Sequence, residues 1–156
     1  NYLQLVGDAL KAHGGEILKF IGDGVMAYFP AEDALFLPQV TGNALGAARR
    51  LIDDIEAANE ARAAGGHDPV RFGIGLHVGP VIFGNIGTED RLDFTVIGPA
   101  VNRASRLEGL TKALGVPVLA SAEFNAASTV PMKSMGKHRL RGVPEPVEVF
   151  TLPEMA

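Results

Sequence analysis

"RFGIGLHVGPVIFGNIGTEDRLDFTVIGPAVNRASRLEGLTK" spans residues 71–112 and contains both of the periodicities that decide the fold. From residue 70 onward, apolar residues alternate with glycine or polar residues, which is typical of a half-buried strand. After Gly98-Pro99, apolar residues instead recur at helical spacing as far as about Leu114. A segment rich in strands that leads into a helix favours an α+β fold.

The strand pattern of residues 70–86 is interrupted at Gly79-Pro80 and resumes at Val81. We therefore predict a hairpin within this stretch. A polar turn over residues 87–91 and a short strand over residues 92–97 follow it. The helix that begins at Gly98-Pro99 should end at Gly115, because glycine readily adopts the left-handed conformation of a helix C-cap.

On the N-terminal side, two short apolar runs flank the tetrad Ile21-Gly22-Asp23-Gly24 and predict a first hairpin. A helix that ends at Gly14-Gly15 precedes this hairpin. An irregular connection over residues 31–42 and a long helix over residues 43–64 follow it. The C-terminal part predicts a strand at 116–120, a short helix from 121, and two last strands at 137–141 and 147–152.

The order of these elements predicts an α+β sandwich that forms one domain over residues 1–156, since the chain shows no repeat, low-complexity tract or linker. Apolar residues make up 47% of the 156 residues, and the net charge is −4. The absence of a basic block argues against nucleic acid as a partner. The absence of cysteine excludes thiolate chemistry and fits a cytoplasmic setting. No apolar run approaches the roughly 20 residues that a membrane span needs.

Asn102 and Arg106 are four residues apart, so they share one face of the predicted helix, away from its apolar stripe. Both side chains donate hydrogen bonds, which suits an anionic ligand, although such a pair is more often simply a solvated helix face. Asp23 at a hairpin tip is usually a turn former and sometimes a metal ligand. By default, Lys19 and Thr95 are ordinary strand residues.

Taken together, three segments resemble the class III nucleotidyl cyclase catalytic domain, of the bacterial adenylate cyclase type. They are residues 14–29 ("GGEILKFIGDGVMAYF"), residues 71–112 quoted above, and residues 140–150 ("LRGVPEPVEVF"). They occur in the family's order over almost the whole chain. The resemblance implies a ferredoxin-like α/β sandwich. It also implies an enzyme that converts ATP into 3′,5′-cyclic AMP and pyrophosphate.

The resemblance further implies a head-to-tail homodimer with two Mg²⁺ or Mn²⁺ ions at each interfacial site. By position, Asp23 is similar to the second metal-binding aspartate, and Asn102 to the residue that orients the ribose. The other matching positions are Lys19 and Thr95 for the adenine base, Arg106 for the α-phosphate and Arg141 for the β- and γ-phosphates. Arg141 stands where the family usually has a lysine.

The family's first metal-binding aspartate and the strand that carries it would precede Asn1, and they do not occur in this sequence. Because the chain starts within a helix and without methionine, we expect the natural protein to continue upstream. Regulatory domains, and sensory or membrane segments, are expected outside this segment. On its own, the segment is expected to be inactive and poorly stable.

Two alternatives stay open at this point. One is a guanylate cyclase, although neither Lys19 nor Thr95 is the carboxylate that would best suit guanine. The other is an inactive cyclase-like module for dimerisation or nucleotide sensing. A diguanylate cyclase is set aside, because Gly22-Asp23-Gly24 does not match the hairpin signature of that family.

Overall fold

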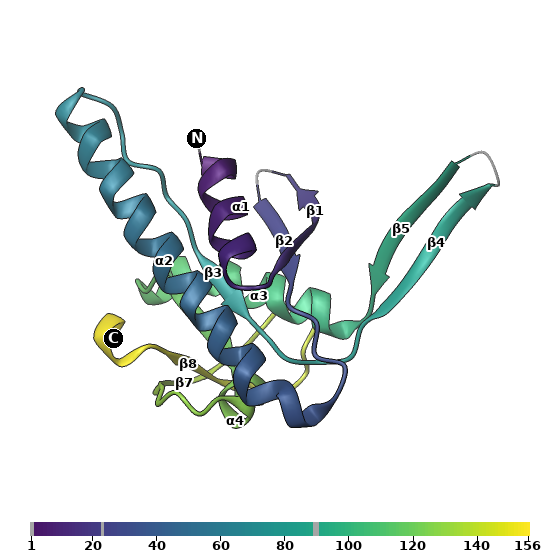
Figure 1. The fold of residues 1–156 in the computed structure, drawn as a ribbon. Helices are drawn as coiled ribbons and strands as arrows, with labels where there is room; N and C mark the ends of the chain where they lie inside the picture. The colour runs from purple at the N-terminus through teal and green to yellow at the C-terminus, as the bar shows by residue number, and fades with distance from the viewer. Residues whose placement is uncertain (1, 23, 89–90) are drawn as a thin grey trace. The chain divides into compact units, whose positions relative to one another are not determined.

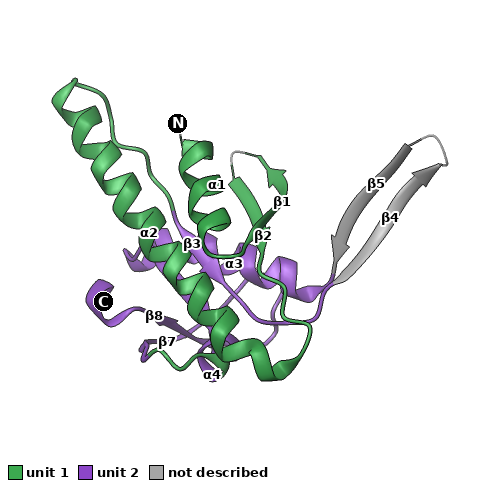
Figure 2. Cartoon of the chain, viewed as in Figure 1, with its two compact units in different colours: residues 1–72, 127–130 green, residues 73–126, 131–156 purple. Residues whose placement is uncertain are grey.

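The structure is a computed structural model that describes residues 2–22, 24–88 and 91–156, with the backbone alone over residues 82–97. Helices are interspersed with runs of strands along the chain, which confirms the predicted α+β class (Figure 1). The chain forms two compact units (Figure 2). We call residues 1–72 with 127–130 the N-terminal unit, and residues 73–126 with 131–156 the C-terminal unit.

In the N-terminal unit, helix α1 (Tyr2–Ala12) lies against helix α2 (Leu37–Ala64). The apolar stripes of both helices are buried, including Val6 and Leu10 on α1 and Ile52 and Ile55 on α2. The packing leaves no room for a side chain at Gly46 of α2, because a Cβ atom there would lie 2.9 Å from the ring of His13, the residue after α1. Packing of the two apolar stripes therefore joins the helices.

The predicted first hairpin is confirmed. Strand β1 (Glu16–Ile21) pairs antiparallel with β2 (Gly24–Tyr28), and Ile21 stands opposite Gly24. Gly22 takes φ +59°, a left-handed conformation that favours glycine at this turn. Most of β1 is exposed, including Phe20 with 60% of its surface accessible.

The prediction of an irregular connection over residues 31–42 was wrong in its second half. A short 3₁₀ helix, η1 (Ala34–Phe36), leads directly into α2, which begins at Leu37 instead of residue 43. Pro38 is compatible with this start, because the first turn of a helix leaves its N–H groups unpaired anyway. The Thr41 hydroxyl donates to the Leu37 carbonyl oxygen at 2.7 Å and adds a contact within that turn.

The C-terminal unit contains a four-stranded sheet in the order β3-β6-β8-β7. Strand β3 (Ile74–Leu76) runs parallel to β6 (Val118–Ser121). Strand β8 (Val147–Thr151) is antiparallel to both β6 and β7 (Lys133–His138). Helix α3 (Pro99–Leu114) packs on β3 and β6, and the short helix α4 (Ala122–Ala127) follows β6. One buried hydrophobic cluster of this unit consists of Leu107, Val116, Leu119, Leu140 and Val149.

The predicted hairpin within residues 70–86 was wrong. Strand β3 pairs with β6 instead, while β4 (Ile82–Thr88) pairs antiparallel with β5 (Arg91–Ile97). Pro80 has no N–H to donate to a strand ladder, and the chain leaves β3 before it. The last two strands were predicted in the right order, but β7 ends at His138, so Arg141 lies in the turn after it.

Among the described residues, no helix is both long enough and apolar enough to cross a membrane. The assignment of residues 1–156 to a single catalytic domain stays a prediction.

Candidate active site

Helix α3 presents two of the predicted site residues on one exposed face. Asn102 and Arg106 are one turn apart and exposed, whereas Leu107 on the opposite side is completely buried. Gly98 precedes the helix with φ 150°, Pro99 occupies its first turn, and Gly115 ends it with φ +69° in the left-handed region. The predicted helix start, helix end and shared face of Asn102 and Arg106 are thus confirmed.

The close packing of α3 on the sheet depends on a glycine in β3. A Cβ atom on Gly75 would lie 2.3 Å from the Ala104 carbonyl oxygen and 2.6 Å from the Glu108 backbone nitrogen. Only a residue without a side chain permits so close an approach of helix and strand backbones. Ala104 lies between Asn102 and Arg106 in the same helix. The contact with Gly75 therefore sets the distance between the sheet and the part of α3 that carries these two residues.

Arg141 lies in the turn after β7 and is exposed. Its neighbour Leu140 is only 5% exposed and belongs to the same core as Leu107. The Val143 N–H donates to the Leu140 carbonyl oxygen at 3.0 Å, and Gly142 takes φ +82° within the turn. Arg106 therefore directly precedes one leucine of this core, Leu107, and Arg141 directly follows another, Leu140. Both are exposed cations of the same unit.

The other predicted residues are less fully described. Lys19 is an exposed residue of β1 and stands opposite Met26 in the N-terminal unit. Thr95 stands opposite Gly84 in the β4–β5 pair, where the structure describes the backbone alone. Asp23 lies outside the described residues. The structure thus brings Asn102, Arg106 and Arg141 into one unit and places Lys19 in the other.

A metal site was expected at Asp23, a carboxylate of the kind that Mg²⁺ and Mn²⁺ bind. In the described ranges, no group of three or more His, Cys, Asp or Glu side chains could hold a metal ion. The metal assignment therefore stays a prediction that depends on Asp23.

Two titratable side chains among the described residues have shifted pKa values, and neither belongs to the predicted site. The pKa of Tyr28 is raised, chiefly because its hydroxyl donates to the Glu16 carboxylate. The pKa of His77 is lowered, first by burial and then by the Arg103 charge, against the opposing effect of Glu123. No local sequence pattern distinguishes His77 from the other three histidines of the chain.

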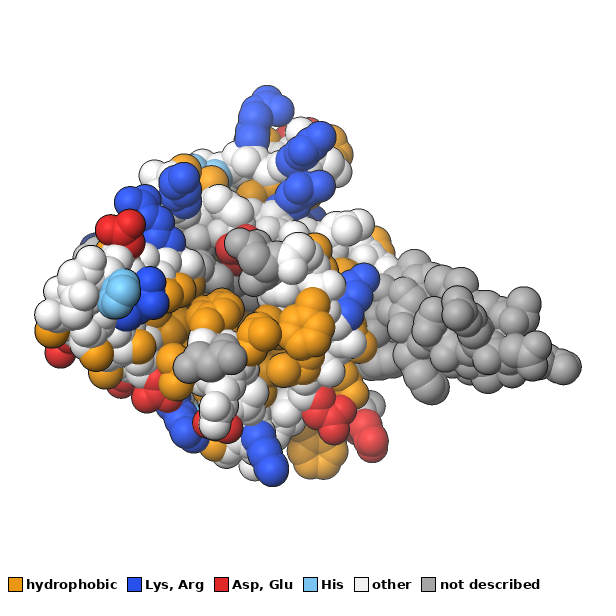
Figure 3. Space-filling view, turned by 90° about the horizontal axis from the view of Figure 1, so that it is seen from above, with side chains coloured by type: hydrophobic (Ala, Val, Ile, Leu, Met, Phe, Trp, Pro, Cys, Tyr) orange, Lys and Arg blue, Asp and Glu red, His pale blue; other side chains and the backbone are white. Residues whose placement is uncertain are grey.

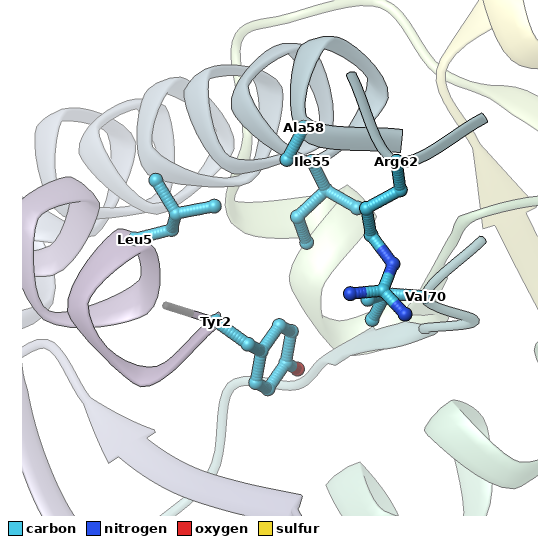
Figure 4. A pocket seen from close by; sticks show the side chains of 6 residues that line it. All are labelled: Tyr2, Leu5, Ile55, Ala58, Arg62 and Val70. Carbon is cyan, nitrogen blue, oxygen red and sulfur yellow. The ribbon is translucent and has the colours of Figure 1, made fainter. Parts of the chain in front are cut away.

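A surface pocket of about 200 Å³ lies in the N-terminal unit, and Figure 4 shows the side chains from α1, α2 and the segment after α2 that line it. They are Tyr2, Leu5, Ile55, Ala58, Arg62 and Val70. The pocket contains none of the predicted site residues. It is also smaller than the roughly 300–1,000 Å³ of typical small-molecule sites, so we do not assign the nucleotide to it.

Exposed apolar side chains are a further feature of the N-terminal unit, including Leu3, Ile17, Phe20 and Ile21. Figure 3 shows hydrophobic side chains gathered on one face of the molecule, with charged side chains near them. Such a grouping is typical of surfaces that contact other protein segments.

Comparison with known proteins places these features in one family. Residues 4–153 match the model of the adenylate and guanylate cyclase catalytic domain. Adenylate cyclase 1 of Rhizobium meliloti (strain 1021) is 33% identical over 153 residues, which cover 96% of this chain and 22% of that protein. The adenylate cyclase of Anabaena cylindrica is 40% identical over 123 residues, which cover 76% of this chain and 23% of that protein.

A solved structure of a bacterial light-regulated adenylyl cyclase superposes with a TM-score of 0.83 at 31% identity. The match covers 99% of this chain and 44% of that one. This chain spans less than a quarter of the length of the two curated relatives described above. The matched model extends over nearly all of the chain, and the chain therefore belongs to the class III adenylate and guanylate cyclase catalytic domain family.

Proposed function

We propose that this chain is the catalytic domain of an adenylate cyclase that converts ATP into 3′,5′-cyclic AMP and pyrophosphate at the interface of a homodimer. The observation that carries the proposal is the exposed face of α3, where Asn102 and Arg106 lie one turn apart on a helix seated tightly on the sheet. Together with the family membership, this face supports a site for a nucleoside triphosphate.

Arg106 is the residue that stabilises charge developing on the α-phosphate. Its guanidinium group stays protonated at any working pH and offers several N–H donors in a fixed fork. Asn102 orients the ribose through its side-chain amide. Removal of one such preorganised donor typically costs about 3 kcal/mol of transition-state stabilisation.

Lys19 and Thr95 select the base. Adenine offers an acceptor at N1 and a donor at its 6-amino group, which match the lysine ammonium and the threonine hydroxyl oxygen respectively. Guanine has an N1–H donor and a 6-carbonyl group, so a carboxylate at one of these positions would suit it better. Neither position is acidic, and ATP is therefore the proposed substrate.

Arg141 binds the β- and γ-phosphates. Arginine keeps the positive charge of the lysine usual at this position and adds fork-like geometry for phosphate oxygens. Asp23 is the residue of this chain that would hold the divalent ions. When bound, these ions would acidify the ribose 3′-hydroxyl and neutralise phosphate charge.

The homodimer follows from the division of roles. Lys19, Thr95, Asn102, Arg106 and Arg141 of one subunit form the nucleotide side of a site, and Asp23 of the other subunit forms its metal side. A twofold arrangement generates two equivalent sites, because each subunit supplies both sides once. Regulatory or sensory domains would belong to a longer protein, as the length of the relatives suggests.

The experiment is a nucleotide cyclase assay of the full-length protein with Mg²⁺ or Mn²⁺, in which ATP and GTP are offered separately. We expect cyclic AMP as the main product and a loss of activity in the Arg106→Ala variant. Lys112→Ala is a matched control, because it removes another exposed cation from α3. Predominant cyclic GMP would favour the guanylate cyclase alternative. No product from either nucleotide would favour a non-catalytic module.

A further inference from the structure

Four polar side chains from different parts of the C-terminal unit form two pairs beside the start of α3, and the proposed function uses none of them. His77 follows β3 directly, and its Nδ1 lies 2.8 Å from the Oγ of Ser121, the last residue of β6. Arg103 of α3 forms an ion pair with Glu123 of α4, with 3.6 Å between Nη1 and Oε2. We call these residues the polar cluster.

Ser121 links the His77 ring to the first turn of α4. The Phe124 N–H in the first turn of α4 donates to the Ser121 Oγ at 3.1 Å. The Ser121 hydroxyl keeps a second lone pair and its own hydrogen, so it can accept from or donate to the His77 Nδ1 according to the tautomer of the ring. Burial favours a neutral imidazole by lowering the pKa of His77. Ser121 is only 3% exposed, so water has little access to the bond.

The other edge of the ring faces the loop between β3 and β4. A Cβ atom on Gly79 would lie 3.0 Å from the His77 Nε2 and 3.0 Å from the Ala100 Cβ. A Cβ atom on Gly98 would lie 3.3 Å from the Pro80 carbonyl oxygen. The loop after His77 therefore passes closely between the ring and the first turn of α3, and Asn102 follows Ala100 by two residues.

The Arg103–Glu123 ion pair ties α3 to α4 at a second point. The Arg103 side chain is 24% exposed and the Glu123 side chain 52%, so solvent weakens their attraction. The part-buried bond between His77 and Ser121 is the stronger candidate for holding the start of α3.

We propose that His77 and Ser121 form a positioning pair, which fixes the first turn of α3 so that Asn102 and Arg106 keep their orientation toward the triphosphate. The proposal rests on the cyclase function proposed above. Neither residue contacts the substrate in this account. Their effect reaches the site through the loop at Gly79 and the backbone of α3.

The experiment compares His77→Asn, His77→Leu and Ser121→Ala in the full-length protein by steady-state kinetics with ATP and by thermal unfolding. An asparagine amide reaches the position of Nδ1 and restores a hydrogen bond to Ser121, whereas leucine fills similar space without one. We expect His77→Leu and Ser121→Ala to lower kcat about tenfold with less than a twofold change in KM, since small misplacement of catalytic groups slows the chemical step. His77→Asn should keep at least about half of the wild-type kcat.

His138→Leu is the matched control. It removes a histidine of the same unit whose Nε2 bonds the Met135 carbonyl oxygen at 2.8 Å, and it should leave kcat unchanged. If His77→Leu fails to fold, the comparison of Ser121→Ala with His77→Asn still decides the question.

Different outcomes separate the two proposals. A wild-type protein that makes no cyclic nucleotide overturns the proposed function, and the positioning pair with it. If the wild type is active and Ser121→Ala keeps the full wild-type kcat, the positioning pair alone is overturned. Equal losses of kcat in the asparagine and leucine variants of His77, each with the same drop in melting temperature, also overturn it, because they indicate packing without a specific bond.

Discussion

Lys19 contributes to the proposed discrimination between adenine and guanine, because its ammonium group can donate to N1 of adenine but cannot accept from the N1–H of guanine. We predict that Lys19→Glu lowers kcat/KM for ATP by at least about tenfold, since the N1 acceptor of adenine would then face a carboxylate. The ratio of GTP to ATP turnover should rise. Lys11→Glu makes the same charge change on an exposed residue of α1 and serves as the control. An unchanged ratio in Lys19→Glu would contradict the base-reading role.

His77 makes stability depend on pH in a defined direction. Burial lowers its pKa in the folded protein below the ordinary value of 6.5, while the unfolded chain keeps that ordinary value. As the pH falls through 6.5, the unfolded state therefore gains protons first, and the free energy of unfolding decreases until the pH is below the folded pKa. The contribution of His77 is fully present above pH 6.5.

Urea unfolding between about pH 8 and pH 5 checks this direction, because the slope of stability with pH counts the protons taken up. His77→Asn has no group that titrates at this position, so its stability should fall less over that range than that of the wild type. The remaining histidines are common to both proteins and cancel in the difference. Parallel stability curves for the two proteins would show that the ring is not the group responsible.

The shared face of Asn102 and Arg106 could be predicted because it depends only on a spacing of four residues within one helix. Arg141 was placed in a strand and lies in a turn, since the end of β7 is set by pairing with β8 and not by local sequence. The bond between His77 and Ser121 joins residues 44 apart. No local pattern reports such a contact, so only the folded chain reveals it.

Helix α3 and strand β3 form the pair of elements on which the proposed site depends. We predict that Gly75→Ala destabilises the protein by about 1–3 kcal/mol or more, because the atoms in the way belong to the α3 backbone and have little room to yield. Gly109→Ala on the same helix meets nothing within 4 Å, so it should stabilise by about 0.5–1 kcal/mol.

The midpoint of urea unfolding at constant m-value measures both changes. Gly75→Ala should also lower cyclase activity, since it lifts the face that carries Asn102 and Arg106. Equal urea midpoints for Gly75→Ala and Gly109→Ala would contradict the close packing of α3 on β3.

Among the elements, those defined by local signals were predicted well. The first hairpin was indicated by the sequence Gly-Asp-Gly between two apolar runs, and α3 by Gly98-Pro99 and Gly115 at its ends. The errors arose where pairing between distant parts of the chain determines the structure. The alternation over residues 70–86 indicated strands correctly, but it could not indicate that β3 pairs in parallel with β6, more than 40 residues away. The start of the long helix was predicted at residue 43, whereas α2 begins at Leu37 with Pro38 in its first turn.

At the level of the assembled protein, the proposed active site requires two chains. In this proposal, the nucleotide side of each site and the metal ligand Asp23 come from different subunits, so a single chain would lack a complete site. This division makes a prediction that concerns the dimer and no individual residue.

The most direct test mixes two inactive variants of the full-length protein, Asp23→Ala and Arg106→Ala, and measures cyclic AMP formation. Each variant alone should be inactive. Random exchange of subunits should restore about a quarter of the wild-type activity, because half of the dimers are mixed and each of these has one intact site of two. As a control, Arg106→Ala mixed with Asn102→Ala should stay inactive, since both changes damage the same side of a site. A mixture of Asp23→Ala and Arg106→Ala that stays as inactive as its parents would contradict the account.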